Sequence, residues 1–326
     1  HGLVASAGGF INFLGGSVVA EGSNAYAVLA SGAGSTVHLE TANLISRAAG
    51  TYVALANTGA SLRLQDAQVT HEGATGFGVA IHTGSTGDLR NVHIRMQGMG
   101  TGLAGGGDVV MLGGSVVADA AGSLAIVARG GSMQLESVDV RGDSGISANG
   151  GARLELVDSR VRSVNEALQI SGMGTTAYIR ESELLGDGGA ATIAVHDSAV
   201  LELLRSVVRS EGDNRVGMDN RGGAVTLEDV QVHTTGVSSH ALYAEASGLV
   251  RPRIDASGTL LSTTGDSAIG AVARKGGSIH LADSAVLTTG DGAHGVLSGG
   301  VGEMTLTNTH VRTEGEGAWA AVINDN

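Results

Sequence analysis

Arg141, Gly142 and Asp143 form the sharpest short motif of the chain. An exposed tripeptide of this type can bind an integrin, because its Asp completes a metal site on the integrin and its Arg reaches an acidic pocket. The tripeptide directly follows Val140, where other repeats of the chain also place a polar residue beside Gly. An ordinary strand-end turn is therefore the alternative interpretation. We treat the three residues as candidate partner-binding residues.

A second candidate feature is a row of basic residues at equivalent, outward-facing positions of a repeated strand pattern. The row consists of Arg95, Arg141, Arg162, Arg209, His233 and Arg312. Arg is enriched at the centres of protein interfaces, so aligned Arg side chains could anchor a protein partner. The alternative is a solvated face on which Arg makes weak salt links to neighbouring acids. Arg95, Arg162, Arg209 and Arg312 join the tripeptide as candidate partner-binding residues.

The sequence carries few signs of catalysis. A polysaccharide-cleaving enzyme needs clustered carboxylates on one face, whereas the outward positions here mix acidic, basic and neutral residues. The sequence contains no Gly-x-Ser-x-Gly, His-Glu-x-x-His or phosphate-binding-loop motif. We therefore expect no enzyme activity, no catalytic residue, no cofactor and no bound metal.

Composition narrows the classes of protein further. The 326 residues carry a formal net charge of −13, which argues against general nucleic-acid binding. The chain has no Cys, so disulfides and thiolate zinc sites are excluded. No apolar run approaches the ~20 residues of a membrane span. Gly is abundant at 54 residues, yet 42% of residues are apolar, which is unlike a disordered linker.

One pattern recurs along the whole chain, and it defines a repeat of about 24 residues. Two apolar residues flank a single residue, and we take the second of them as the anchor of a coil. An aliphatic residue follows five positions later in every coil except one, where Thr259 follows the anchor Ile254. The anchors are Phe13, Leu39, Leu64, Leu89, Met111, Leu135, Leu156, Ile179, Leu203, Leu227, Ile254, Leu281 and Leu306.

Alternation with period two predicts strands that bury one face. The residue before each anchor is mostly polar and should face outward, as at Arg63 and Glu155. The third residue after the anchor is mostly small, which suits a tight corner. Examples are Ala42, Ala67, Ser159, Ser182, Ser206, Ser257 and Ser284. Pairs such as Gly130-Gly131 predict a second corner with positive φ.

The sequence therefore predicts an all-β fold, a right-handed single-stranded parallel β-helix of about 13 coils. Residues 1–326 should form a single domain, filled by Val, Leu, Ile and Ala because aromatic residues are only 2%. The coil around Pro252 is the longest and least regular, so we expect an irregular, exposed segment there.

The repeat resembles that of autotransporter passenger domains of Gram-negative bacteria, in particular the pertactin-like passengers of Bordetella. The resemblance covers the whole chain and rests on segments such as residues 281–290 and on the Gly-Gly corners. It implies a passenger fragment without its signal peptide, autochaperone segment and translocator barrel. It also implies passage through the periplasm and display on, or release from, the cell surface, with the chain's own barrel as a further partner.

The resemblance leads to three functional hypotheses. The first is a non-catalytic virulence factor that binds a host serum or complement-regulatory protein and so promotes serum resistance. The second is adhesion to host-cell integrins through Arg141-Gly142-Asp143. The third, for which the residues give the least support, is a β-helix enzyme that acts on polysaccharides.

Overall fold

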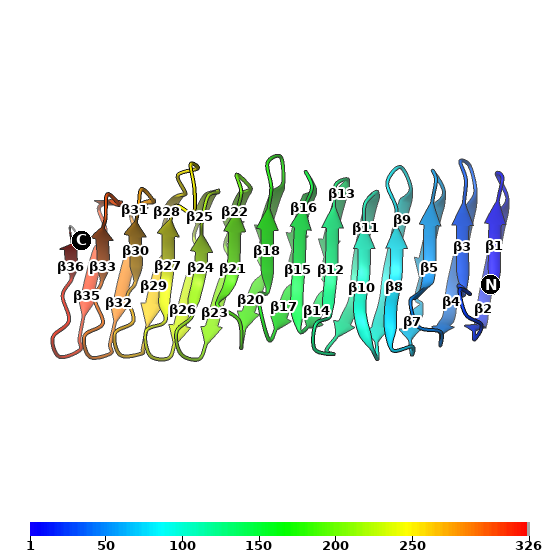
Figure 1. The fold of residues 1–326 in the computed structure, drawn as a ribbon, viewed down its shortest axis with the longest axis horizontal. Helices are drawn as coiled ribbons and strands as arrows, with labels where there is room; N and C mark the ends of the chain where they lie inside the picture. Colours follow the sequence, from blue (N-terminus) through cyan, green and yellow to red (C-terminus); the bar gives the residue numbers. More distant parts are fainter. Residues whose placement is uncertain (325–326) are drawn as a thin grey trace. The chain divides into compact units, whose positions relative to one another are not determined.

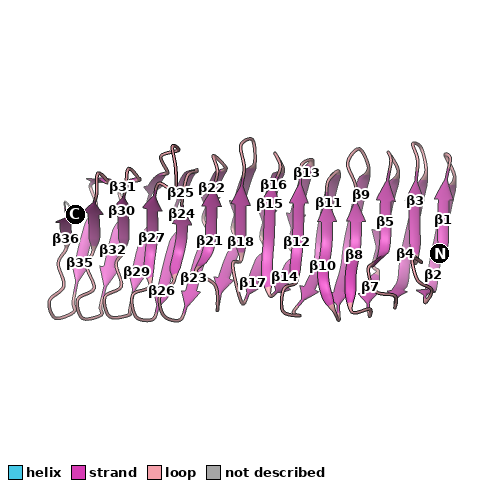
Figure 2. Ribbon diagram, in the orientation of Figure 1, coloured by secondary structure: helices cyan, strands magenta, loops and turns pink. Residues whose placement is uncertain are grey.

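The computed structural model describes residues 1–324. The chain divides into two compact units, His1–Arg160 and Val161–Asn326. Residues 1–324 contain strands, turns and irregular segments but no helix (Figure 2). The all-β prediction is confirmed.

The N-terminal unit is a stack of parallel strands. One sheet has the strand order β1-β3-β5-β8-β10-β12-β15, and these strands lie side by side in Figure 1. The remaining strands pair parallel from coil to coil on the other walls. The strands are β1 (Leu3–Ser6), β2 (Phe10–Ala20), β3 (Val28–Ser31), β4 (Thr36–Ser46), β5 (Thr51–Asn57), β6 (Ser61–Gln65), β7 (Gln68–His71), β8 (Thr75–Ile81), β9 (Thr86–Met96), β10 (Met99–Gly105), β11 (Asp108–Ala118), β12 (Leu124–Arg129), β13 (Ser132–Glu136), β14 (Asp139–Gly142), β15 (Ser144–Asn149) and β16 (Arg153–Val157).

The C-terminal unit repeats the same arrangement, with the sheet order β18-β21-β24-β27-β30-β33-β36. Its strands, with β17 at the division between the units, are β17 (Arg160–Ser163), β18 (Leu168–Ser171), β19 (Thr176–Arg180), β20 (Glu183–Gly186), β21 (Ala191–His196), β22 (Val200–Leu204), β23 (Val207–Glu211), β24 (Val216–Asn220), β25 (Ala224–Glu228), β26 (Gln231–Thr235), β27 (His240–Glu245), β28 (Arg253–Ser257), β29 (Leu260–Thr263), β30 (Ala271–Arg274), β31 (Ser278–Ala282), β32 (Ala285–Thr288), β33 (Val296–Gly299), β34 (Glu303–Thr307), β35 (His310–Thr313) and β36 (Ala321–Asn324).

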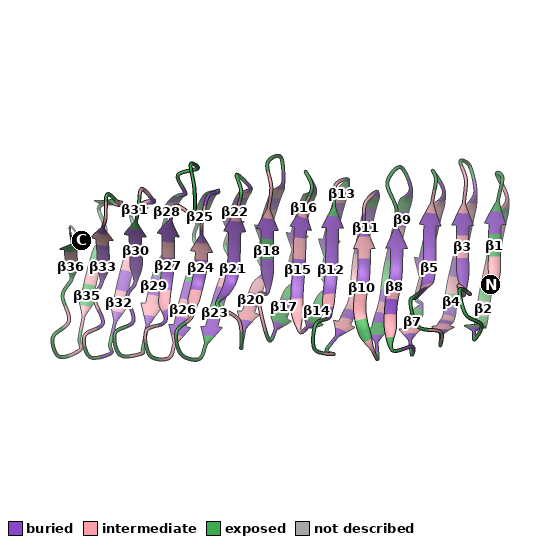
Figure 3. Cartoon of the chain, viewed as in Figure 1, coloured by how far each residue is buried: buried purple, intermediate pink, exposed green. Residues whose placement is uncertain are grey.

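The anchors of successive coils lie directly opposite one another in this parallel register. In the N-terminal unit, Leu39, Leu64, Leu89, Met111 and Leu135 form one continuous column. Each of these side chains is at most 1% exposed. Figure 3 shows the same pattern, with buried strand centres and exposed loops. Both units are therefore parallel β-solenoids with aliphatic cores, and the chain makes about 13 turns in all, as the repeat predicts.

One anchor is corrected by the register. Leu227 of β25 pairs with Ala256 of β28, not with Ile254, and Ala256 pairs with Leu281 of the next coil. The position five residues after the anchor is then Leu261, which pairs with Val232. A shift of two residues keeps the same face buried, so alternation alone could not separate the two registers.

The same correction changes the role of Thr259. It occupies the small corner position, three residues after the anchor, for which the sequence pattern predicts Ser257. Its side chain is 1% exposed, and its hydroxyl donates a hydrogen bond to the backbone oxygen of Ser257 at 3.1 Å. The exception to the repeat therefore disappears, because the extra residues of this coil lie in the loop at 246–252 instead.

The corner after each anchor has a feature that the pattern did not predict. The second residue after every anchor has a positive φ, between 46° and 70°. Only three of these residues are Gly, and Asp and Asn fill six more positions because their short polar side chains tolerate this conformation best. The row consists of Gly15, Thr41, Asp66, Asn91, Gly113, Ser137, Asp158, Glu181, Arg205, Asp229, Gly258, Asp283 and Asn308.

Candidate functional site

The structure places Arg141 and Gly142 at the end of β14, followed by a single bend residue, Asp143. The Arg141 guanidinium forms a two-pronged ion pair with Asp119, and this pairing lowers the pKa of the Asp119 carboxyl. The Asp143 carboxylate accepts a hydrogen bond from the backbone N–H of Gly122 at 2.9 Å. The tripeptide thus forms part of the solenoid wall, and a role in integrin binding stays a prediction.

The five Arg residues of the predicted basic row are all exposed. Their equivalence is confirmed where strands pair: Arg95 and Arg141 both lie opposite Val117, and Arg209 lies opposite His233. Apolar residues also occupy the row, such as Val117 and Leu287, the latter opposite Arg312. The row is therefore a mixed basic and apolar stripe, not an unbroken line of charge.

Acidic neighbours balance most of this charge. Arg162 pairs with Asp187 at 3.0 Å, Arg209 with Glu183 at 3.2 Å and Arg312 with Glu314 at 2.7 Å; Arg141 pairs with Asp119. Such exposed pairs contribute about 0–1 kcal/mol each. A partner could exchange these contacts at little cost, so binding by Arg95, Arg162, Arg209 and Arg312 stays a prediction.

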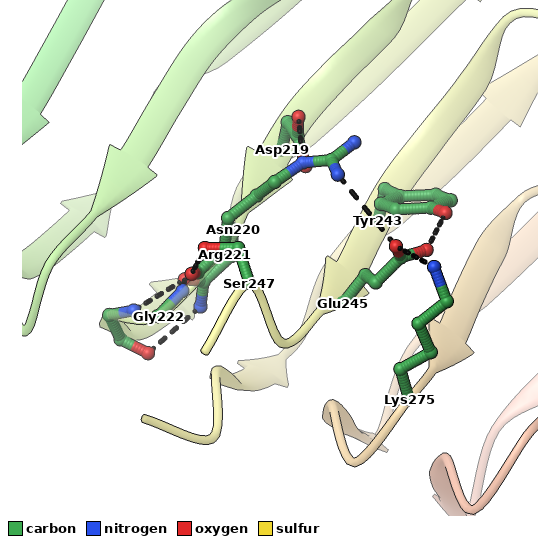
Figure 4. Close-up of polar contacts among 9 residues, drawn as sticks. Asp219, Asn220, Arg221, Gly222, Tyr243, Glu245, Ser247 and Lys275 are labelled. Carbon is green, nitrogen blue, oxygen red and sulfur yellow. Dashed lines mark hydrogen bonds and ion pairs between the residues drawn. The ribbon is translucent and has the colours of Figure 1, made fainter. Parts of the chain in front are cut away.

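A denser polar cluster, which sequence reasoning missed, lies on the C-terminal unit at the ends of β24, β27 and β30 (Figure 4). Arg221 donates to both carboxylate oxygens of Asp219, at 2.9 and 3.1 Å, and its guanidinium lies 5.3 Å from the centre of the Tyr243 ring. Glu245 accepts hydrogen bonds from the Tyr243 hydroxyl and from Lys275, the latter at 2.7 Å. Arg221 also approaches Glu245, at 3.8 Å.

Burial and hydrogen bonds act in opposite directions on the pKa values of the carboxylates in this cluster. Burial raises the pKa of Asp219, against the pull of Arg221, and together with the hydrogen bond to Glu245 it raises the pKa of Tyr243 to about 12. Burial also acts to raise the pKa of Glu245, but the hydrogen bonds from Lys275 and Tyr243 outweigh it, so that pKa is lowered. Both carboxylates have cationic partners, so the cluster can link β24, β27 and β30 as a structural element.

Hydrogen bonds next to this cluster fix the loop at 246–252, the irregular segment that the sequence predicts around Pro252. Ser247 donates its hydroxyl proton to the backbone oxygen of Arg221 at 2.9 Å. The buried Asn220 amide donates to the backbone oxygens of Gly223 and Arg253, both at 3.0 Å. The tip of the loop is apolar, since Leu249 is fully exposed and Val250 is 44% exposed. The loop therefore has a hydrogen-bonded base and an exposed apolar tip.

An aromatic row on the outer face of the N-terminal unit was also missed. Tyr26, Tyr52 and Phe77 occupy equivalent positions, and the Tyr52 and Phe77 rings are stacked with centroids 4.7 Å apart. Beside them, across β5, β8, β10 and β12, runs a groove of about 690 Å³. The three residues are each about one repeat apart in the sequence, and this spacing could have revealed the row.

Residues 1–324 contain no group of three or more His, Cys, Asp or Glu side chains that could hold a metal ion. Over the same residues, no helix is long and apolar enough to cross a membrane.

The fold defines a class: a parallel β-solenoid with exposed loops and walls. Among solved structures, the chain is similar to Vag8, a Bordetella autotransporter passenger, in the cryo-EM structure of the Vag8–C1 inhibitor complex. The TM-score is 0.67 and the sequence identity 18%, over 98% of this chain and 96% of that chain. No protein-family model and no curated protein sequence matches the chain. The resemblance to autotransporter passengers is thereby confirmed at the level of the fold.

Proposed function

We propose that this chain is a non-catalytic autotransporter passenger that binds a host serum protein of the complement-regulatory class, with C1 inhibitor as the first candidate. One observation carries the proposal: the chain shares its fold, over 98% of its length, with Vag8 in a complex with C1 inhibitor. We further infer that residues 1–326 belong to one passenger domain, which a translocator barrel displays on, or releases from, a Gram-negative cell.

The surfaces of the chain are compatible with protein binding. A specific interface buries about 800 Å² on each partner and needs a few well-placed anchors inside a polar rim. Exposed Arg side chains with weakly held acidic partners supply a rim, and Leu249 on its anchored loop supplies an apolar anchor. These features support binding without naming the partner.

Capture from serum tests the proposal without assuming the partner. The chain is immobilised and exposed to human serum, and retained proteins are identified by mass spectrometry. A second column carries the urea-unfolded chain as a control for non-specific retention. We expect a complement-regulatory serum protein on the folded chain alone. An empty eluate at micromolar chain contradicts the proposal.

A further inference from the structure

The aromatic row of the N-terminal unit ends abruptly. Tyr52 and Phe77 are paired across β5 and β8, and the next position of the row, on β10, is Thr101 instead of a ring. Because neighbouring strands lie about 4.8 Å apart, a ring at the Thr101 position would continue the stack at the 4.7 Å spacing of Tyr52 and Phe77. The Phe77 face toward β10 therefore has no aromatic neighbour among the described residues.

Small residues on β10 open the groove at this point. Thr101 and Ala104 of β10 line the groove. On either side of them, β8 contributes Phe77, and β12 contributes Leu124 and Val127. Its floor is apolar, since Ala80 is 1% exposed and Val127 is 7% exposed. A volume of about 690 Å³ lies within the range of small-molecule sites.

The charge at the groove is unusual for so acidic a chain. None of the described residues that line the groove is Asp or Glu, although the chain carries 32 of them. Arg129 lines the groove and has no ion-pair partner within residues 1–324. His82, which meets the Tyr52 ring edge to face at 5.9 Å, and Thr83 complete a polar side. An anion near Arg129 would accept a charge-assisted hydrogen bond that no protein carboxylate now accepts.

We propose that this groove binds a free small molecule, a flat aromatic carboxylate. Its ring lies over Thr101 and Ala104 against the open face of Phe77, and its carboxylate meets Arg129. The proposal is independent of the capture of a serum protein, because it concerns one sheet face of the N-terminal unit and a different class of ligand.

Calorimetric titration with three matched probes tests the ligand chemistry. Indole-3-acetate should bind saturably, with a Kd on the order of 1 mM or tighter. Indole-3-acetamide, which lacks the charge, and cyclohexylacetate, which lacks the flat ring, should each bind at least about five-fold more weakly. Equal affinity for all three probes, or no saturable binding of indole-3-acetate, overturns the proposal.

Five variants locate the site. Thr101→Phe places a ring beside Phe77 in the groove and should abolish binding of indole-3-acetate. Thr70→Phe, on the outer side of β7, should leave this binding unchanged. Arg129→Gln should remove the preference for the acetate over the acetamide, and Arg95→Gln should retain it. Ala104→Leu fills the groove beside Thr101 and replaces Thr101→Phe if thermal unfolding shows that variant to be misfolded. Unchanged binding of indole-3-acetate in the folded Thr101→Phe or Ala104→Leu variant contradicts the proposal.

Discussion

The hydroxyl oxygen of Ser284 accepts a hydrogen bond from the backbone N–H of Thr259, 3.1 Å away in the preceding coil. The same hydroxyl donates to the backbone oxygen of Ala282 at 2.7 Å. Ser206 makes the equivalent pair of bonds, to the N–H of Ser182 and the oxygen of Leu204. Hydroxyl side chains at this corner therefore satisfy buried backbone groups that the strand ladder leaves unpaired.

Ser284→Ala tests this corner bond. The substitution removes the acceptor of a buried N–H, so we expect the free energy of unfolding to fall by about 1–3 kcal/mol in a urea titration. Ser262→Ala changes a half-buried Ser on the outward row and should alter stability by less than about 0.5 kcal/mol. Similar effects of the two substitutions would contradict the structural role of Ser284.

In the positive-φ row, a substitution to Gly should not lower the free energy of unfolding, although it does so elsewhere in a strand. Thr41 is β-branched and has a φ of 54°, a strained conformation for such a residue. Thr41→Gly should therefore be neutral or stabilise the fold by up to about 1 kcal/mol, because relief of strain offsets the entropy of Gly. Thr226→Gly, on the exposed face of β25, relieves no strain and should cost about 1 kcal/mol. Two equal losses in chemical denaturation would refute the assignment of the corner.

Acid should weaken the C-terminal unit through His240. Burial lowers the pKa of His240 to about 4, while its ring nitrogen accepts a hydrogen bond from the N–H of Ile269 at 3.0 Å. The unfolded chain binds a proton near pH 6.5, so this contribution is complete above that pH and is lost as pH falls toward 4. Between pH 7.5 and 5 we expect a loss of about 1–2 kcal/mol that His240→Gln removes.

His310→Gln is the matched control for this pH dependence, because His310 is exposed on β35. Urea titrations of the three proteins at both pH values give the comparison. If His240→Gln retains the full wild-type dependence, another group is responsible.

The integrin hypothesis has its own measurement. Arg141 pairs with Asp119, and the Asp143 carboxylate accepts a hydrogen bond from the N–H of Gly122, so an integrin would have to exchange both contacts. The hypothesis predicts that integrin-bearing cells attach to the wild-type chain and that Asp143→Glu abolishes this attachment. Asp119→Asn, which frees Arg141, should increase attachment. Equal attachment to the wild-type chain and to Asp143→Glu rejects the hypothesis.

The repeat was sufficient to predict the strands and the core because its information is local. Leu64 and Leu89 are apolar, evenly spaced and flanked by polar residues, and each consequence of that pattern is found in the structure. The pattern failed at Ala256, where Ile254 offered an equally apolar alternative two residues away. Only the pairing of β25 with β28 distinguishes them.

The surfaces were less predictable, because they depend on which residues of different coils become neighbours. The aligned Arg positions could be derived from the repeat, but their pairing with Asp119 or Asp187 could not. The groove exists because Thr101 is smaller than its neighbours Phe77 and Leu124. A search of the sequence for conspicuous residues overlooks such a small one.

Direct titration of purified C1 inhibitor against the folded chain tests the central proposal most sharply. Surface plasmon resonance with the immobilised chain should show saturable binding with a Kd of about 1 µM or tighter, as expected for a specific interface of standard size. The urea-unfolded chain should give no signal. An absence of saturable binding at tens of micromolar C1 inhibitor, with the chain shown to be folded, would contradict the account.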